Sequence, residues 1–436
     1  MTVRVGYLTK RFPRLSETFI LDEILGLEAA GLELCLYALG DPGEEIVQPD
    51  VARVRSPVVY LHPPGGFRER AAGALAALGA HLRLAVRAPR RYLGVVAYIA
   101  RKRRHLSTLR HFVEAGRLAV RCSDDGVGHL HAAFAHGPAS VAHFVHLLTG
   151  LPFSFAAHAK DLYVSAPDLL ARKIAAAELV LACSRSVAGE LRAIAGTGAA
   201  AGTGAGPGKV VLAYHGVDTE RFKAAGPGAG AGCGPLRLLA VGRLVEKKGY
   251  PVLLEALAIV LQSGRQVTCS IIGSGPRRAQ LAEAAERLGI ERWVSFLGGR
   301  THEQVASAYR AASIFVQASI VLADGDRDGV PNSLLEAMAS GLAVVASDVA
   351  GIPEALAPGC GLLVPAGEAR ALADGLIELC DHPELRSRMG QAARRHVVEH
   401  FDRARLAVEV ASLFGGGPGG QALAGGRSLA SATLAS

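Results

Sequence analysis

Two carboxylates eight residues apart, Asp328 and Glu336, form the part of the chain with the clearest capacity for chemistry. They begin and end D-G-V-P-N-S-L-L-E, which continues A-M-A-S-G-L-A-V-V-A. This pattern predicts a short helix capped by Asn332 or a neighbour and ended by Gly341, followed by a buried strand over 342–346. The amides at a helix N-terminus favour an anion. A phosphate flanked by two carboxylates that bind hydroxyls describes a nucleotide sugar.

A group of cations lies in a second stretch, L-R-L-L-A-V-G-R-L-V-E-K-K-G-Y. The pattern predicts a buried strand that runs into a loop with Arg243, Lys247 and Lys248, before a helix with Pro251 in its first turn. Cations beside a helix N-terminus can neutralise a diphosphate leaving group as a glycosyl bond breaks. The structural alternative is a solvated basic turn.

Together these motifs resemble retaining GT-B glycosyltransferases of family four, in particular the exopolysaccharide or colanic-acid-type branch. The resemblance rests on the E-x7-E-like stretch, on G-R-x-x-x-x-K-G, on H-G-V-D and on H-L-H-A-A-F-A-H-G-P-A-S, and it covers about residues 1–414. It implies the α/β GT-B fold, in which two Rossmann-like parallel-sheet domains face each other across a cleft. The alternation of strand-like and helix-like runs in both halves independently favours this class.

The resemblance also implies roles for single residues of the second half. Arg243 and Lys248 would bind the donor diphosphate and Glu336 the ribose hydroxyls. Asp328 would bind the sugar hydroxyls with main-chain help from Gly329 and Val330, although the family usually carries the longer Glu at this position. Two further donor contacts are implied: the turn G-S-G-P, with Gly273 and Gly275, and Arg300, which lies where the main chain of the family meets the base.

In the first half, His158 and Asp161 follow a predicted strand directly, and ligands bind at the carboxyl ends of such strands. By resemblance His158 reaches the donor sugar near its anomeric carbon and belongs with Asp328, Arg243 and Lys248 to the catalytic set. Asp161 lies beside it on the acceptor side. The loop after the first strand adds Lys10, Arg14 and Ser16, which could contact an anionic acceptor group or be solvated.

Two patterns could suggest a metal, but we expect none. His129 and His131 alternate on a predicted strand, yet no acid or cysteine joins them at a ligand-like spacing, so we expect polar partners at a sheet edge. Asp324, Asp326 and Asp328 form overlapping D-x-D pairs of the kind that hold a divalent cation under a diphosphate. Because Arg243 and Lys248 could supply that charge, we interpret the repeat as a solvated loop. No cofactor is expected beyond the nucleotide-sugar co-substrate.

The net charge of +8 arises from an excess of cations in one segment of the chain. Nine cations lie in segment 83–110, where no acid occurs, and leucines, valines and tyrosines are interleaved with them: Arg83, Arg87, Arg90, Arg91, Arg101, Lys102, Arg103, Arg104 and Arg110. The segment is helical by pattern over 71–112, and Pro89 divides it into two helices. It could dock on an anionic membrane or be an amphipathic helix with solvated arginines. Few aromatics accompany the cations, which argues against nucleic acid.

The length of 436 residues predicts two or three domains. We expect an N-terminal acceptor-side domain over 1–215, a linker over 216–235, a nucleotide-sugar-binding domain over 236–395, a helix crossing back over 396–414 and a disordered tail over 415–436. The seven scattered cysteines favour a reduced compartment. Neither a signal segment nor a transmembrane run is evident. The expected location is the cytoplasm, with docking on the inner face of the membrane as the functional reading of the basic segment.

The function implied is retaining transfer of a hexose from a nucleotide diphosphate sugar, UDP-linked, to a lipid-linked or growing exopolysaccharide. No residue stands out as a covalent nucleophile, so a same-face displacement assisted by the leaving phosphate is implied. Two alternatives remain open. One is a sugar phosphorylase or nucleotide-sugar epimerase on the same fold, and the other is a non-catalytic membrane-binding protein.

Overall fold

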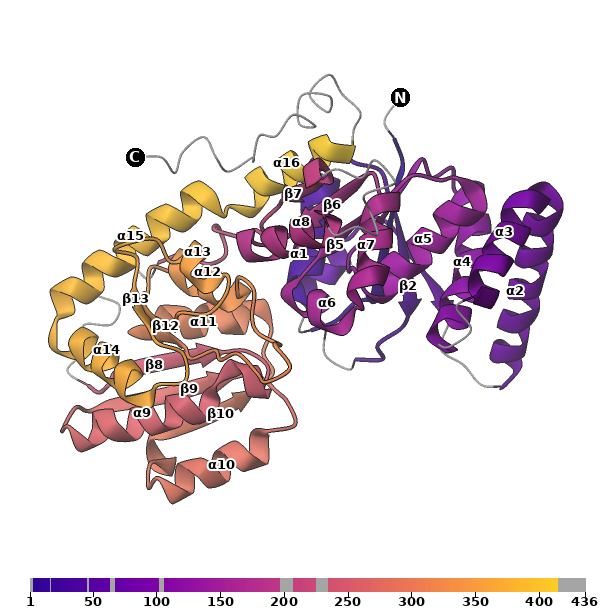
Figure 1. Ribbon diagram of the computed structural model, residues 1–436. Helices are drawn as coiled ribbons and strands as arrows, with labels where there is room; N and C mark the ends of the chain where they lie inside the picture. The colour runs from indigo at the N-terminus through magenta and orange to yellow at the C-terminus, as the bar shows by residue number, and fades with distance from the viewer. Residues whose placement is uncertain are drawn as a thin grey trace. The chain divides into compact units, whose positions relative to one another are not determined.

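Two separate parallel β-sheets organise the chain. The computed structural model describes residues 3–15, 17–44, 47–62, 67–101, 106–196, 207–224 and 234–414 (Figure 1). One compact unit contains the chain up to Cys183, Val187–Ala213 and the end of the last helix from Ala407. The other contains Ser184–Ser186 and Tyr214–Leu406.

The first unit is built on a seven-stranded parallel sheet of order β3-β2-β1-β4-β5-β6-β7. Its strands are β1 (Val5–Arg11), β2 (Leu34–Gly40), β3 (Val58–His62), β4 (His129–Ala132), β5 (Phe153–Ala157), β6 (Leu179–Ala182) and β7 (Val210–Leu212). Its helices are α1 (Thr18–Ala29), η1 (Pro49–Arg53), α2 (Phe67–Arg87), α3 (Pro89–Arg101), α4 (Leu106–Asp124), α5 (Gly137–Thr149), α6 (Ala159–Val164), α7 (Pro167–Ala176), α8 (Arg185–Gly196) and η2 (Pro207–Lys209). The last helix, α16 (Arg403–Phe414), returns to this unit.

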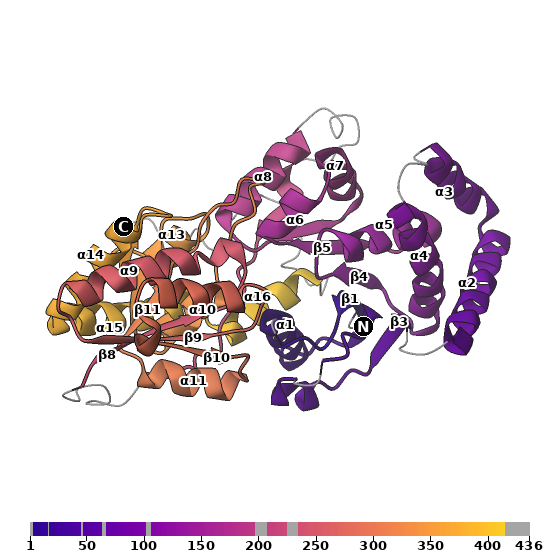
Figure 2. The same cartoon turned by 90° about the horizontal axis from the view of Figure 1, so that it is seen from below.

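Alternate side chains of these strands enter two cores. On β1, Leu8 packs into the core shared with α4, α5 and α8, whereas Tyr7 packs into the core shared with α1 and α16. This alternation is the period-two geometry of a strand, and both faces are apolar because helices cover both. Helices α2 and α3 lie outside α4 and form an outer layer of this unit (Figure 2).

The second unit is built on a six-stranded parallel sheet of order β10-β9-β8-β11-β12-β13. Its strands are β8 (Leu236–Val241), β9 (Val267–Ile272), β10 (Val294–Gly298), β11 (Ile314–Gln317), β12 (Ala343–Ser347) and β13 (Leu362–Val364). Its helices are η3 (Glu246–Lys248), α9 (Tyr250–Gln262), α10 (Arg278–Arg287), η4 (Glu291–Trp293), α11 (His302–Ala311), α12 (Asn332–Ala339), α13 (Ile352–Ala355), α14 (Ala369–Asp381) and α15 (Pro383–His400). Helices α9 and α14 pack on one face, and α11, α12 and α15 pack on the other.

The structure differs from the predicted elements in two places. The basic segment forms three helices, because α4 begins at Leu106 in addition to the division at Pro89. The predicted returning helix over 396–414 is divided, since α15 ends at His400 and α16 begins at Arg403. The chain passes into the second unit at Tyr214, and much of the predicted linker, like the predicted tail, lies outside the described residues.

Candidate active site

The order of the second sheet reverses between β8 and β11, which are neighbours although three helical connections separate them along the chain. In an open parallel sheet, ligands bind outside the carboxyl ends of the strands at such a reversal. The two loops that leave this point are 242–249, after β8, and 318–331, after β11. They carry most of the predicted donor-binding residues.

The two loops are fixed to each other through Gly249. This residue has φ +62°, and a Cβ atom there would lie 1.9 Å from the carbonyl oxygen of Ala318, so only glycine allows the approach. The amide of Ile320 donates a hydrogen bond of 2.8 Å to the carbonyl of Lys247. Backbone contacts therefore hold the start of the loop after β11 against the η3 turn.

Two lysines of the η3 turn bind the aspartates of the facing loop. The Nζ atom of Lys248 lies 2.8 Å from Oδ2 of Asp328. The Nζ atom of Lys247 lies 2.9 Å from Oδ1 of Asp326 and 3.8 Å from Oδ1 of Asp328, and it donates a 3.1 Å hydrogen bond to the carbonyl of Arg327. The D-x-D loop is thus fixed by ion pairs, and our interpretation of it as simply solvated was wrong.

Asp328 is buried, with 7% of its surface exposed. Besides Lys248, its Oδ2 accepts a 2.6 Å hydrogen bond from the Ser319 hydroxyl, and the Gln317 amide lies 3.5 Å away. Burial alone would raise the pKa of this carboxyl, but Lys248 and Lys247 lower it below its usual value. Asp328 is therefore an ionised carboxylate surrounded by two lysines, a serine and a glutamine.

The second carboxylate, Glu336, lies inside α12 and is buried. Its Oε2 accepts a 3.0 Å hydrogen bond from the hydroxyl of Tyr309, which also donates to the carbonyl of Ser333 at 2.9 Å. The helix begins at Asn332, so Pro331 occupies the cap position and makes no side-chain cap. Of the predicted candidates, Asn332 or a neighbour, the neighbour Pro331 takes the cap position, and Gly341, at φ +74°, ends the helix as predicted.

The glycines of the G-S-G-P turn pack against the loop after β8. A Cβ atom on Gly273 would lie 1.9 Å from the carbonyl oxygen of Gly242, and one on Gly275 would lie 2.5 Å from that of Leu244. Glycine at these two positions therefore lets the turn pack directly against the backbone of the loop after β8. Whether they also contact a donor stays a prediction.

The remaining donor-side residues lie at the same edge of the sheet. Arg243 is exposed in the loop after β8, and Arg300, also exposed, lies just after β10. The main chain of Gly329 and Val330 packs against Gly351, where a Cβ atom would lie 2.8 Å from the carbonyl carbon of Gly329. The structure thus brings all the predicted donor residues of the second unit to the carboxyl ends of its strands.

In the first unit, one carboxylate joins two histidines. The buried Asp161 accepts a 2.5 Å hydrogen bond at Oδ1 from Nδ1 of His136, while its Oδ2 lies 3.3 Å from Nδ1 of His158 and 2.9 Å from the His158 amide. Burial alone would raise the pKa of Asp161, but the hydrogen bonds from His136 and His158 lower it. Asp161 therefore orients His158, and sequence reasoning missed the equivalent position of His136.

A buried lysine, Lys173, binds the backbone next to His136. Lys173, 1% exposed, donates hydrogen bonds of 2.7 Å to the carbonyl of Ala135 and 3.1 Å to that of His136. Burial lowers its pKa to about 8, although Asp161 opposes the shift. The lysine thus fixes the backbone that carries His136.

The predicted acceptor-side loop is only partly described. Lys10 is exposed at the end of β1. Arg14 forms ion pairs with Glu17 at 2.9 Å and Glu44 at 3.2 Å, so an anionic acceptor would have to compete with two carboxylates. Ser16 lies outside the described residues.

His129 and His131 lie on β4 in the middle of the sheet, so their expected place at a sheet edge was wrong. Their polar partner is Ser154 on β5, whose hydroxyl lies 2.7 Å from Nε2 of His129 and 2.8 Å from Nδ1 of His131. Burial lowers the pKa of both histidines, to about 4 and about 3 respectively. Among the described residues, no three His, Cys, Asp or Glu side chains are arranged to hold a metal ion.

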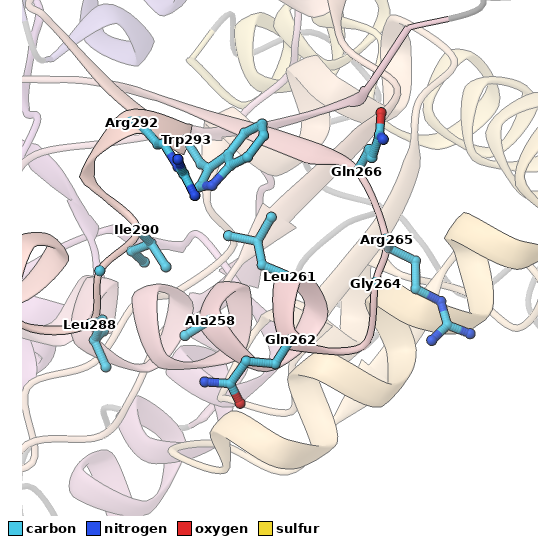
Figure 3. A pocket seen from close by; sticks show the side chains of 11 residues that line it. Ala258, Leu261, Gln262, Gly264, Arg265, Gln266, Leu288, Ile290, Arg292 and Trp293 are labelled. Atoms are coloured by element: carbon cyan, nitrogen blue, oxygen red, sulfur yellow. The ribbon is translucent and has the colours of Figure 1, made fainter.

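A cavity of about 380 Å³ lies elsewhere in the second unit (Figure 3). Its lining includes Leu261 near the end of α9, together with Gln266 and Trp293, which directly precede β9 and β10. The predicted donor residues lie at the carboxyl ends, so this cavity is not part of the candidate site.

Comparison with known proteins finds a family match within the second unit. Residues 232–396 match the family model "Glycosyl transferases group 1". Over 146 residues the chain is 43% identical to the amylovoran biosynthesis glycosyltransferase AmsK of Erwinia amylovora, covering 33% of this chain and 36% of that protein. Over 208 residues it is 36% identical to the putative colanic acid biosynthesis glycosyltransferase WcaL of Escherichia coli K12, covering 47% and 50%. The chain thus spans about half the length, or less, of these relatives.

Solved structures agree over nearly the whole chain. Anabaena Alr3699/HepE, crystallised with UDP, has a TM-score of 0.67 at 16% identity, covering 94% of this chain and 98% of that one. Sucrose-phosphate synthase from Thermosynechococcus elongatus has a TM-score of 0.69 at 18% identity with the same coverage. The chain therefore has the GT-B fold, as predicted. Its second unit resembles the group 1 glycosyltransferases, which confirms that part of the expected resemblance.

Four residues of these clusters carried no assigned role in the sequence: Lys247, Ser319, Tyr309 and His136. Lys247 contacts Asp326 from 79 residues away along the chain, whereas Ser319 contacts Asp328 from nine residues away within the same loop, and no recognisable spacing marks either contact. His136 did carry a signal, because it lies in H-G-P-A-S directly after the predicted strand that holds His131.

Proposed function

We propose that this chain is a retaining glycosyltransferase that moves a hexose from a UDP-linked sugar to a lipid-linked or growing exopolysaccharide. The observation that carries the proposal is the grouping of Arg243, Lys248 and Glu336 at the reversal of the second sheet, within the residues that match the glycosyltransferase family. The names of the relatives, which concern amylovoran and colanic acid biosynthesis, support the acceptor class. The UDP bound to HepE supports the nucleotide.

In the proposed reaction, the bond between the anomeric carbon and the diphosphate oxygen breaks and its electron pair passes to the diphosphate. Arg243 and Lys248 stabilise the charge that develops there. The acceptor oxygen attacks from the same face, and its proton passes to the departing phosphate. Glu336 holds the ribose hydroxyls, and His158, oriented by Asp161, contacts the sugar. Because the two cations supply the charge, the reaction needs no divalent metal, and full loss of turnover in EDTA would contradict this.

A donor panel tests the proposal. Nucleotide release is measured with UDP-glucose, UDP-galactose, UDP-N-acetylglucosamine and GDP-mannose, with and without a membrane extract as acceptor. We expect turnover with one UDP-sugar, an axial or equatorial product linkage that matches the donor by NMR, and a loss of about a hundredfold in Lys248→Ala. Release of sugar phosphate or of an epimerised nucleotide sugar without an acceptor would identify a phosphorylase or an epimerase instead.

We further propose that the outer layer formed by α2 and α3 docks on an anionic membrane, as a lipid-linked acceptor would require. Apolar side chains of α2 are exposed at helical spacing, with Leu75, Leu78, Leu82 and Val86 between 65% and 76% exposed, while Ala77 and Leu84 on the other face are buried. The arginines at 83, 87, 90 and 91 are exposed beside them. An apolar stripe with flanking cations is the composition of an interfacial helix.

Vesicle sedimentation tests this docking. We expect binding to phosphatidylglycerol vesicles that weakens with salt, and little binding to phosphatidylcholine vesicles. Equal binding to both, or binding to neither, would contradict membrane docking. None of the described helices is long and apolar enough to cross a bilayer. A cytoplasmic protein held at the inner face is the location that this proposal requires.

A further inference from the structure

We propose that Asp328 substitutes for the donor diphosphate in the unliganded site, by binding Lys248 until the diphosphate displaces it. The inference rests on the proposed function, and it changes the role expected for Asp328. By resemblance this carboxylate would contact the donor sugar. In the structure it contacts the lysine expected to bind the diphosphate.

The close contacts of Asp328 are made by one oxygen of its carboxylate, Oδ2. Oδ2 lies 2.6 Å from the Ser319 hydroxyl and 2.8 Å from Nζ of Lys248, and Oδ1 lies 3.8 Å from Nζ of Lys247. The close contacts thus converge on Oδ2, and a diphosphate that binds Lys248 would have to displace this oxygen. Aspartate is one methylene shorter than the glutamate usual in the family, so its carboxylate stays close to its own backbone and to these partners.

The stem of Lys248 lies along the loop, close to Gly242. Its Cε and Cδ atoms lie 3.2 and 3.5 Å from the place that a Cβ atom on Gly242 would occupy, so this glycine leaves room for the stem to pack along the loop. An ammonium group has three N–H donors, and its side chain is 13% exposed. The ammonium can therefore turn from Asp328 to a phosphate oxygen while its stem remains in place.

The charges near Asp328 favour this exchange. Lys247 is already paired with Asp326 at 2.9 Å, so it neutralises the loop and does not depend on Asp328. Lys248 and Asp328 form the pair that an incoming anion would disturb. The side chain of Lys248 is only 13% exposed, and a largely enclosed charge without a counterion is costly, so Asp328 stabilises this ammonium as long as no other anion binds it. The same carboxylate then competes with the diphosphate, and repels it once bound.

This role predicts a direction that a sugar contact does not. Removing the negative charge of Asp328 should tighten the binding of every diphosphate, with or without a sugar. A unit charge about 5 Å from the ligand corresponds to roughly fourfold in Kd at the dielectric constant of water and to roughly three-hundredfold at the value near a protein surface, so we expect a change of at least about fourfold. If Asp328 instead contacted the sugar, UDP and pyrophosphate would bind unchanged, and only the UDP-sugar would bind more weakly.

The test is calorimetric titration of the full chain with UDP and with inorganic pyrophosphate. Asp328→Asn and Asp328→Ser both remove the charge, and the second leaves room for a water between Ser319 and Lys248 if the first fails to fold. Asp324→Asn is the matched control, because Asp324 is exposed in the same loop and contacts neither lysine. We expect binding of both ligands to be tighter by at least about fourfold in the Asp328 variants, and a Kd within twofold of the parent in the control.

Unchanged or weaker binding of UDP and pyrophosphate by folded Asp328 variants would overturn the inference. The proposed function fails separately: a parent chain that binds UDP but transfers no sugar in the donor panel would refute transfer and leave the inference standing. Tighter binding that occurs equally in Asp324→Asn would also overturn it, since the effect would then be one of general charge.

Discussion

The hydroxyl of Tyr309 donates a hydrogen bond of 3.0 Å to Oε2 of Glu336, inside the second unit where both side chains are buried. Tyr309 belongs to α11 and Glu336 to α12, so this bond joins two helices on the same face of the sheet. It fixes the carboxylate that we assign to the ribose. The proposed donor site therefore also depends on Tyr309, to which we assign no contact with the donor.

Tyr309→Phe should weaken nucleoside binding without altering phosphate binding. The change removes the hydroxyl and leaves Glu336 with one donor fewer, so we expect a loss of about 1–2 kcal/mol in stability and a several-fold rise in the Kd of UDP. The Kd of pyrophosphate, which has no ribose, should not change. Tyr60→Phe in the first unit, which removes a 3.0 Å bond to the carbonyl of Phe12, is the control and should leave UDP binding intact.

The pKa of Lys173 makes stability depend on pH in a defined window. Its folded value of about 8 lies below the usual 10.5, so between these pH values the unfolded chain binds a proton that the folded chain has released. Stability therefore rises with pH across this window, by roughly 1 kcal/mol per pH unit. We expect Lys173→Met to lose this slope relative to the parent in urea unfolding at pH 7.5–10. Parallel curves for the two proteins would contradict the assignment.

Gly273 and Gly298 provide a matched pair of substitutions. Both have positive φ, +146° and +71°, but a Cβ atom on Gly273 would meet the carbonyl of Gly242 at 1.9 Å, while one on Gly298 would meet nothing within 4 Å. We expect Gly273→Ala to cost about 3–5 kcal/mol and Gly298→Ala about 1 kcal/mol. The fluorescence of Trp293, the single tryptophan of the chain, reports unfolding of this unit. Equal losses would show that the close approach is not required.

The exposed stripe on α2 can be changed without touching a core. Leu78 and Leu82 are 68% and 65% exposed, so replacing both with Glu should leave the melting temperature within about 2 °C of the parent. We expect a loss of at least tenfold in binding to phosphatidylglycerol vesicles, because the change removes apolar area and adds negative charge. Leu288→Glu in the second unit, 37% exposed, is the control. Unaltered sedimentation of the double variant would exclude α2 as the docking surface.

Local patterns predicted the fold well where the determinants are close in sequence. The helix before Gly341, the strand after it and the division at Pro89 all depend on residues within a few positions of each other. The sequence left the cap open between Asn332 and a neighbour, and in the structure the neighbour Pro331 takes that position without a side-chain hydrogen bond. Residue types alone do not decide which of several neighbours takes the cap position.

The candidate site was predicted as a set of residues but not as a set of contacts. Lys248 and Asp328 were assigned to different parts of one ligand, and the structure pairs them with each other across eighty residues of chain. Lys247 received no role of its own from the sequence, yet it is the buried one of the two lysines, with 8% of its surface exposed. Such pairings depend on the order of the strands in the sheet, which is set by long-range packing and has no local signature.

The return of α16 to the first unit has a consequence for synthesis. The ring of Phe414 packs 5.6 Å from that of His129 and 5.1 Å from that of His131, on the sheet made by the first half of the chain. A ribosome completes the second unit, which ends at Leu406, before it reaches Ala407–Phe414, the part of this helix that belongs to the first unit. The first unit to be translated is thus the last to close its core, and until then one side of its sheet offers apolar surface to chaperones and to other nascent chains.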